Sequence, residues 1–358
     1  MKKLVLIVVI AIIVIVLIVL SGGSKSDRAT TAQVIRIGGV LSLSGAAAQD
    51  GESIKNGMEL AKVDLKKQGV DVEFIYQDDK TEAKDTVSAI NAVAVQKVDA
   101  IIGPTWSFLG DAGVPVINQL KLVALMPANT SEYVSSRSPY AFFTTSKVEQ
   151  LISPLATWLK EHNKKRIVLV YNKAAWGEVV GKAVEVAAKQ AGAEVVYIEA
   201  VQYGSEVETL PTTLAKIRSL NADLLFFEID DDKGLATLFK KVQELNIPGD
   251  IMSVTTSLAR VLSSGVAAPK NDFYIVSPTL SVEFKNIYTA HYGKAPGAYA
   301  DRAYDSVMLL ADAMKKKGEV PLVEYLRTQT DYPGLAGRYK FDVNNDIIGG
   351  DWVVEKLK

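Results

Sequence analysis

Short apolar runs rich in β-branched residues alternate along this chain with longer stretches in which apolar residues recur at helical spacing. In the first half, the runs predict strands and the longer stretches predict the helices between them. The predicted strands are 35–43, 72–77, 99–103 and 122–126, and the predicted helices are 51–67, 82–97 and 106–120. Regular alternation of strand and helix is typical of parallel βαβ units.

The same alternation starts again in the second half of the chain. Gly51 matches Gly177 and Asp99 matches Asp223, each pair at the same place relative to its neighbouring strand and helix. We interpret this as an internal repeat that predicts two similar open α/β lobes, although any two βαβ segments share some likeness. The predicted strands here are 166–172, 194–201, 223–229 and 250–254, and the predicted helices are 176–190, 211–220 and 233–245.

Ligands of open α/β sheets bind beyond the carboxyl ends of the strands, so the loops after matched strands should face each other across a cleft. When positions are counted from the matched aspartates and glycines, a residue of one lobe has a counterpart in the other lobe. The repeat nominates three such pairs, which are Ser107 with Asp231, Thr130 with Thr255, and Asp50 with Trp176.

Two strand-end loops of the first lobe offer groups that suit an anion. The stretch GPTWS ends at Ser107, where a helix begins and backbone N–H groups lack helical partners, and PANTSEY carries the hydroxyl of Thr130. Together they could hold a carboxylate without a charged side chain. The alternative is that Ser107 only caps its helix.

Four acids follow the apolar run LLFF in the second lobe, and they offer negative charge to a cation. Asp231 is best placed to receive a ligand ammonium group, with Glu228 and Asp230 close to it. The alternative is an acidic loop that caps the helix starting at Lys233, since acids favour helix N-termini. The stretch DDDKG lacks the ligand spacing of a calcium loop, so we expect no metal site.

Three aromatic residues are expected near the mouth of the cleft, where they would enclose apolar parts of a ligand. They are Trp106, Trp176 and Tyr299. For Trp176 the alternative is simple packing between its loop and the lobe.

Composition narrows the function. The net charge is −1, which does not suggest a nucleic-acid partner, and the absence of cysteine excludes disulfides, thiolate nucleophiles and cysteine zinc sites. There are only two histidines, in unrelated contexts, and the phosphate-loop, serine-hydrolase, metalloprotease and dinucleotide motifs are missing. We therefore expect neither enzymatic activity nor a cofactor.

The N-terminus predicts export. Lys2 and Lys3 precede an unbroken apolar run from Leu4 to Leu20, followed by small and polar residues. We assign 1–23 to a signal peptide or a retained membrane anchor and 24–33 to a polar tether, with the rest outside the cytoplasm. LSGG resembles a bacterial lipobox with Gly23 in place of the cysteine, so lipid attachment is not expected there.

Several stretches in order resemble the branched-chain amino-acid binding proteins of ABC importers: SLSGAAAQDGESIKNGMELA, DAIIGPTWS, LVALMPANTSEY, IVLVYNKAAWGE and AYADRAYDSVMLLADA. The likeness runs from about Ile35 to Lys358. It implies a type I periplasmic binding protein, an α/β fold of two Rossmann-like lobes with parallel sheets. It also implies three hinge crossings, near Lys147, Pro278 and Tyr332. The implied lobes are 34–147 with 279–331, and 148–278 with 332–358.

The resemblance also implies roles for single residues. Ser107 and Thr130 fall where the family binds the ligand carboxylate, and the Ala128 backbone assists. Thr105 and Trp106 fall where the family lines the wall of the site. Trp176 falls where the family has an aromatic over the ligand. Tyr299 falls at an apolar contact, and Asp231 falls at or beside a family tyrosine.

Two positions depart from the family pattern. The acid that takes the ligand ammonium falls on Thr255, and Asp50 replaces the aromatic that covers the ligand side chain in leucine binders. One interpretation is that the acid that pairs with the ligand ammonium has moved to Asp231 or its neighbours. The other is that the ligand lacks an ammonium there, or that it has a polar group near Asp50. We expect an amino acid or related small carboxylate delivered to an ABC permease. The alternative is a membrane-anchored ligand-sensing domain that signals through a partner.

Overall fold

The computed structural model describes residues 34–358 with short gaps, and Ile35–Lys358 forms one compact unit. The expected export signal and tether lie outside the described residues. Within the described part, no helix is both long and apolar enough to cross a membrane. The gaps fall at 130–137, 203, 230, 255–257, 259–260, 263, 279, 330, 349–351 and 358.

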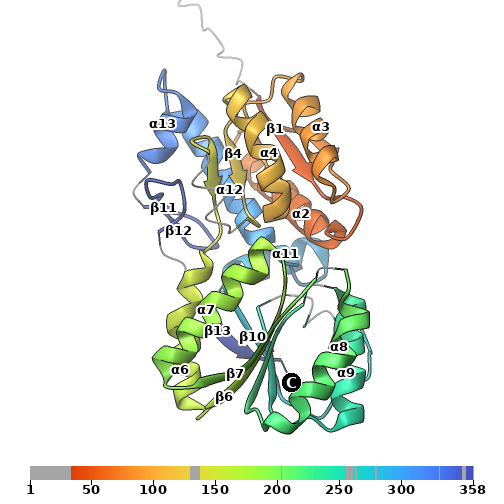
Figure 1. Cartoon of the computed structure of the whole chain (residues 1–358). Coiled ribbons are helices and arrows are strands. Elements are labelled where there is room, and N and C mark those ends of the chain that lie inside the picture. The colour runs from red at the N-terminus through yellow and green to blue at the C-terminus, as the bar shows by residue number, and fades with distance from the viewer. Residues whose placement is uncertain are drawn as a thin grey trace, which may run out of the picture. The chain divides into compact units, whose positions relative to one another are not determined.

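The first half of the chain builds a five-stranded sheet in the order β2-β1-β3-β4-β5, with every neighbouring pair parallel (Figure 1). The three short strands, β3, β4 and β5, are buried throughout, as expected for a parallel sheet covered on both faces. The strands are β1 (Ile35–Leu41), β2 (Val72–Asp78), β3 (Ala100–Ile102), β4 (Ala124–Met126) and β5 (Ala141–Phe143).

Helices cover both faces of this sheet because successive strand residues point to opposite sides. Ile102 lies in the core under α2 and α12, whereas Ile101 lies in the core under α3 and α4. The helices here are α2 (Ala48–Lys67), α3 (Ala83–Ala94), α4 (Ser107–Leu120), α11 (Val282–Tyr292), α12 (Ala300–Lys316) and α13 (Leu322–Arg327).

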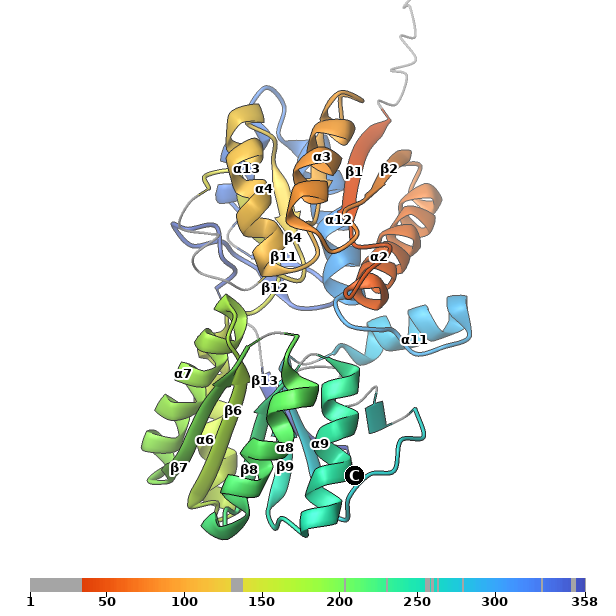
Figure 2. The same ribbon diagram turned by 45° about the vertical axis from the view of Figure 1, so that its right-hand side comes forward.

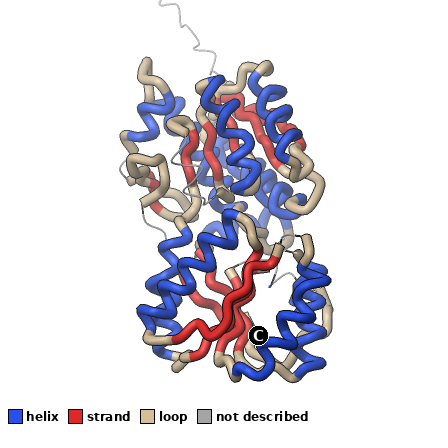
Figure 3. Tube along the Cα trace, in the orientation of Figure 1, coloured by secondary structure: helices blue, strands red, loops and turns tan. Residues whose placement is uncertain are grey.

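The second sheet has six strands in the order β13-β10-β9-β8-β6-β7, and only β13 runs antiparallel to its neighbour (Figure 2). Its strands are β6 (Arg166–Asn172), β7 (Glu194–Val201), β8 (Leu224–Glu228), β9 (Asp250–Ser253), β10 (Phe273–Pro278) and β13 (Trp352–Lys356). Its helices are α6 (Ile152–Glu161), α7 (Ala175–Ala191), α8 (Glu206–Ile217) and α9 (Asp232–Leu245). Figure 3 shows helices on both sides of these strands.

The two sheets share one strand order, which confirms the internal repeat. Numbered within each repeat, both read 2-1-3-4-5, as β2-β1-β3-β4-β5 and as β7-β6-β8-β9-β10. In this order the chain reverses direction across the sheet between the first and third strands. The reversal points therefore lie between β1 and β3 in the first sheet and between β6 and β8 in the second.

The start of α8 was predicted five residues too late. The helix was expected from Pro211, but α8 begins at Glu206 and contains Pro211. Glu206 and Glu208 lie in the true first turn, where acids are favoured, and the proline removes only one backbone hydrogen bond.

The chain passes between the two sheets three times. It leaves the first sheet after β5, returns after β10 to place Phe284 of α11 in the first core, and ends in β13 of the second sheet. Before that last passage, the small hairpin of β11 (Tyr332–Pro333) and β12 (Arg338–Tyr339) forms, and Tyr339, Phe341 and Ile347 pack in the first core.

Candidate functional site

The reversal point of the first sheet is crossed by a buried hydrogen bond. Ser42, the residue after β1, donates its backbone N–H to Oγ1 of Thr105 at 2.9 Å. The strand-end loops meet so closely that a β-carbon on Gly103 would lie 2.0 Å from the Val40 carbonyl oxygen. Thr105 is fully buried, so its hydroxyl joins the loop after β3 to the loop after β1 inside the protein.

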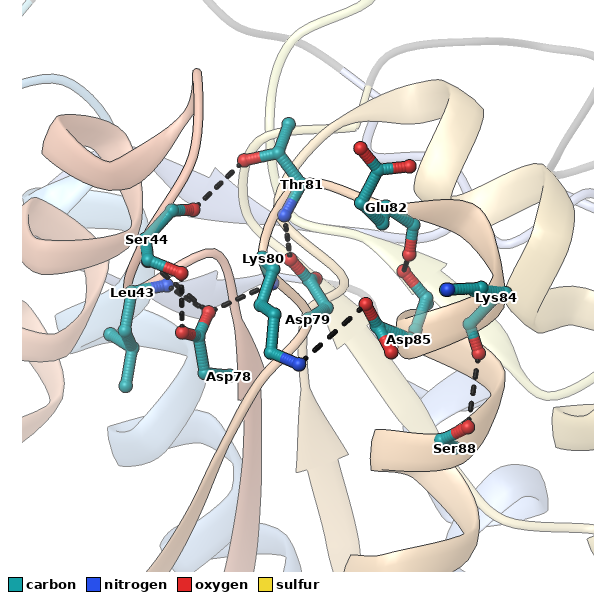
Figure 4. Close-up of polar contacts among 11 residues, drawn as sticks. Leu43, Ser44, Asp78, Asp79, Lys80, Thr81, Glu82, Lys84, Asp85 and Ser88 are labelled. Atoms are coloured by element: carbon teal, nitrogen blue, oxygen red, sulfur yellow. Dashed lines mark hydrogen bonds and ion pairs between the residues drawn. The ribbon is translucent and has the colours of Figure 1, made fainter.

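The loop after β1 is held by the end of β2, as Figure 4 shows. Asp78 accepts hydrogen bonds from the Leu43 N–H at 2.9 Å and the Ser44 hydroxyl at 2.6 Å. Burial alone would raise the pKa of Asp78, but bonds from Ser44 and from the N–H groups of Lys80 and Leu43 lower it below 3.8. Asp79 accepts from the Ser42 hydroxyl at 2.6 Å, so this edge is rigidly built.

Asn129 joins the loop after β4 to the loop after β3. Its side chain is fully buried, and Nδ2 donates to the Pro104 carbonyl at 2.5 Å and the Thr105 carbonyl at 3.3 Å. Ala128 beside it is also buried. Neither Ser42 nor Asn129 was singled out from the sequence, in which Ser42 lies inside the predicted strand 35–43 and Asn129 lies three residues after the predicted strand 122–126. Thr130 lies outside the described residues.

Ser107 is the first residue of α4, and Trp106 occupies the cap position without a side-chain hydrogen bond to the helix. The structure thus assigns the cap position to Trp106, one residue before Ser107. Ser107 is buried, with 7% of the residue exposed. The first turn of α4 contains no acidic residue, and the N-terminus of a helix favours negative charge.

Trp106 and Asp50 are in direct contact at the same edge. The indole Nε1 of Trp106 donates to Oδ2 of Asp50 at 3.0 Å, which links the loop after β3 to the first turn of α2. Phe108 stands edge-on to Trp106, with the ring centroids 6.3 Å apart. Asp50 thus accepts a hydrogen bond from the Trp106 indole N–H in this structure.

A second indole–carboxylate pair spans the reversal point of the second sheet. Trp176 on α7 donates Nε1 to Oε1 of Glu228, the last residue of β8, at 2.8 Å. Glu228 is fully buried, and its Oε2 would lie 3.1 Å from a β-carbon on Gly177, so the carboxylate rests against the first turn of α7. That helix end favours negative charge. Trp176 also packs on the second core, as its alternative interpretation held.

Asp231 caps α9. Its carboxylate accepts from the Gly234 N–H at 2.5 Å, and the helix begins at Asp232, one residue earlier than predicted. The capping interpretation is confirmed, whereas an ammonium contact by Asp231 stays a prediction. Asp230 and Thr255 lie outside the described residues.

Tyr299 precedes α12 in a left-handed backbone conformation with φ of 65°. Such a conformation is uncommon for a bulky residue and is found where the surroundings impose it. The close packing of α12 on α2 begins at the next residue, since a β-carbon on Gly57 would lie 2.0 Å from the Ala300 carbonyl oxygen.

The structure gathers the candidate residues at the carboxyl edges of both sheets. The helices that start there, α4 and α7, contact each other. Among the described residues, no group of three histidine or acidic side chains is placed to hold a metal ion. The first edge carries Asp50, Thr105, Trp106, Ser107 and Ala128, and the second carries Trp176, Glu228 and Asp231.

Comparison with known proteins places this architecture among its relatives. Residues 34–355 match a family model described as periplasmic binding protein. A Pseudomonas aeruginosa leucine-, isoleucine-, valine-, threonine- and alanine-binding protein is 22% identical over 340 residues, 90% of each chain. The Leu/Ile/Val-binding protein of Escherichia coli K12 is 23% identical over 202 residues, 55% of this chain and 54% of that protein.

Solved structures share the fold. The substrate-binding protein LivJ of Streptococcus pneumoniae in complex with isoleucine has a TM-score of 0.77 and 21% identity, covering 90% of this chain and 100% of that one. A Rhodopseudomonas palustris solute-binding protein in complex with 3,4-dihydroxybenzoic acid has a TM-score of 0.75 and 19% identity, covering 90% and 93%. The expected fold class is confirmed, and the chain belongs to the periplasmic binding protein family.

Proposed function

We propose that this protein is the extracytoplasmic solute-binding component of an ABC transporter and delivers an amino acid or related small carboxylate to a permease. Family membership supports a binding protein over an enzyme. The related proteins named for leucine, isoleucine and valine, and the related structures with isoleucine or a benzoic acid, support a small carboxylate as ligand.

The observation that carries this proposal is the start of α4 at Ser107. The helix begins at the reversal point of the first sheet, where open α/β sheets bind their ligands. The flanking loops are held in place by the hydrogen bonds of Thr105 and Asn129, so the start of α4 is preorganised at this edge of the sheet. We expect Thr130 to add its hydroxyl.

We propose that the two sheets with their helices form two lobes that close on the ligand, so that the permease recognises the closed form. The first crossing lies near Lys147 and the second near Pro278. We place the third between Ile347 and Trp352 instead of near Tyr332, because Tyr339 and Ile347 pack in the first core and β13 pairs with β10. Residues 332–347 then belong to the first lobe.

We further propose that residues 1–23 direct export as a cleaved signal or retained anchor, and that 24–33 tether the binding unit. This location would place the protein where a permease of the cytoplasmic membrane can reach it. Uptake of radiolabelled ligand by cells with and without this protein tests delivery: lost uptake supports transport, whereas unchanged uptake favours a sensing role.

A thermal-shift screen of residues 34–358 against the amino acids, their amides and small aromatic acids tests the ligand class. At least one carboxylate should raise the melting temperature, because a ligand that binds only the folded state stabilises it. Calorimetry on Ser107→Ala should then show weaker binding. The matched control is Ser88→Ala, an exposed serine on α3 that bonds only to its own helix. A stabilised protein with equal affinity in both variants would move the site away from α4.

A further inference from the structure

Three charged side chains meet where the chain first leaves the first sheet. The Lys147 ammonium group lies 2.9 Å from an oxygen of Asp346 and 3.1 Å from an oxygen of Asp342. The Asp346 side chain is only 4% exposed, so solvent screens this contact less than it screens a surface ion pair. Burial alone would lower the pKa of Lys147, but hydrogen bonds to Asp346 and Asp342 and their charges raise it, so the lysine stays protonated. We call these three side chains the Lys147 cluster.

The two acids of the cluster are fixed to the first sheet. They lie in the loop 342–346, which runs beside the edge strand β5. In this loop, the carbonyl of Asn345 accepts a hydrogen bond from the Phe143 N–H at 3.0 Å. The residues on either side of the loop, Phe341 and Ile347, pack in the first core. The carboxylates therefore have a fixed place relative to the first sheet.

The lysine of the cluster is the last residue of the first crossing. Thr144 still bonds to the first core, with its hydroxyl 2.8 Å from that of Ser306 on α12. Val148, the residue after the lysine, packs in the second core. The first crossing is thus 145–147, and the side chain at its end reaches back to the acids of the first sheet. A rotation of one sheet relative to the other must bend the backbone beside Lys147 or draw its ammonium away from these acids.

The same acids directly precede the third crossing. Asp346 is followed by Ile347 in the first core, and the Ile348 N–H donates to the Lys340 carbonyl at 2.7 Å. The chain then reaches the second core at Trp352. The cluster therefore joins the end of the first crossing to the start of the third. While its contacts are intact, these two crossings cannot move independently of each other.

We propose that the Lys147 cluster is a hinge lock, which ties the first and third crossings into one unit and sets the equilibrium between open and closed lobes. This inference rests on the proposed function, because it requires lobes that close on a ligand. The apparent affinity of a protein scales with the fraction of molecules in the binding-competent conformation. A substitution of Lys147 should therefore change the affinity for every ligand by one common factor, although Lys147 is not a candidate ligand-binding residue.

Distances between two spin labels test the hinge lock without a ligand. The chain contains no cysteine, so Ser88→Cys on α3 and Ala215→Cys on α8 provide two exposed labelling sites, one in each proposed lobe. Pulsed electron paramagnetic resonance then gives the distribution of distances between the lobes. In Lys147→Met the distribution of the ligand-free protein should shift or broaden, whereas Lys147→Arg, which keeps a cation, should retain the wild-type distribution.

Two controls separate the hinge from loss of charge and from loss of stability. Lys356→Met removes the cation of a more exposed ion pair with Asp272, and Val242→Ala removes buried volume from α9. Both should keep the wild-type distance distribution. Calorimetry then uses those of L-leucine, L-phenylalanine and benzoate that bind the wild type. Lys147→Met should change their affinities by the same factor, about threefold or more, and the controls should leave them unchanged.

The outcomes separate this inference from the function on which it rests. An unchanged distance distribution in Lys147→Met, or an affinity change that differs from one probe to the next, would overturn the hinge lock and leave a solute-binding protein standing. If no carboxylate in the wider screen binds the wild type or alters its distance distribution, the proposed function fails instead. The inference then fails with it, because there is no closure for the cluster to control.

Discussion

Gly51 packs against Ser42 so closely that a β-carbon on the glycine would lie 1.9 Å from the serine carbonyl oxygen. The second repeat contains the same contact, where a β-carbon on Gly177 would lie 2.0 Å from the Asn172 carbonyl oxygen. In both repeats the helix after the first strand is thus pressed onto the end of that strand. The matched glycines in the sequence mark this close approach.

Gly51→Ala should therefore destabilise the protein by about 2–3 kcal/mol, because the added carbon must displace backbone atoms that cannot rotate away. Urea unfolding measures the change in the free energy of unfolding. Glu52→Ala, on the same helix but with an exposed side chain, serves as the control and should change it by less than about 0.5 kcal/mol. Equal effects of the two substitutions would show that the close approach does not constrain α2.

Two substitutions of Asp231 distinguish a role as the cap of α9 from a role in binding the ligand ammonium. Asp231→Ser keeps an oxygen that can cap α9, whereas Asp231→Ala removes the cap and should cost about 1 kcal/mol of stability. If Asp231 only caps the helix, affinity for L-phenylalanine or L-leucine should be unchanged in the serine variant. A loss of amino-acid affinity in both variants, with stability retained in Asp231→Ser, would assign the ligand ammonium to this carboxylate.

Lys147 lies where the chain leaves the first sheet, and its ammonium group is 2.9 Å from Asp346 and 3.1 Å from Asp342. Lys147→Met would leave two neighbouring carboxylates without their shared cation and should cost about 2 kcal/mol in urea unfolding. The control is Lys356→Met, which breaks a more exposed ion pair with Asp272 and should cost less than about 1 kcal/mol.

The loss of stability caused by Lys147→Met should also depend on pH. Burial alone would raise the pKa of Asp342, but hydrogen bonds from the Asp346 N–H, Lys147 and the Asn344 N–H lower it below 3.8. The stability that this carboxylate contributes is present above its unfolded pKa and is lost as the pH falls through its folded pKa. The difference between wild type and Lys147→Met should accordingly shrink in strong acid. A difference that stays constant down to the lowest pH would contradict this ion pair.

The contribution of Asp305 to stability should depend on pH in the opposite sense to that of Asp342, so that stability falls as the pH rises. Burial raises its pKa to about 6, against the bonds that it accepts from Ala336, Leu335 and Tyr339. Between the unfolded pKa near 3.9 and pH 6, the folded protein keeps a proton that the unfolded chain has released. From pH 4.5 to 7, wild type should therefore lose about 2 kcal/mol relative to Asp305→Asn, measured by urea unfolding. Parallel pH profiles of the two proteins would contradict the raised pKa.

Much of the fold could be predicted from the sequence, because strand and helix periodicity is strong and the chain repeats it. The matched Gly51 and Gly177 indicated two equivalent sheets, which the shared strand order confirms. The start of α8 was missed because Pro211 resembles a helix start, although the acids that favour the first turn precede it. The hairpin at Tyr332–Pro333 and Arg338–Tyr339 escaped prediction because two-residue strands have no period.

The positions of the candidate residues could be predicted from the sequence, but their hydrogen-bond partners could not. Counting along the repeat predicted that Ser107, Asp50 and Trp176 lie at the sheet edges, since the strand ends of a parallel sheet lie together. It could not show that Asp50 accepts from Trp106 or that Glu228 accepts from Trp176, because these contacts join residues far apart in the chain. The cap at Asp231 was recognisable as an alternative because it is local.

The most direct test of the central claim is calorimetry that compares an acid with its primary amide on wild type and Ser107→Ala. The probes are L-phenylalanine and L-leucine with their amides. We predict one ligand per protein, weaker binding of each amide than of its acid, and about tenfold or greater loss of acid affinity in Ser107→Ala, with little change for the amide. Equal affinity for acid and amide, or an unchanged acid affinity in Ser107→Ala, would contradict a carboxylate held at the start of α4.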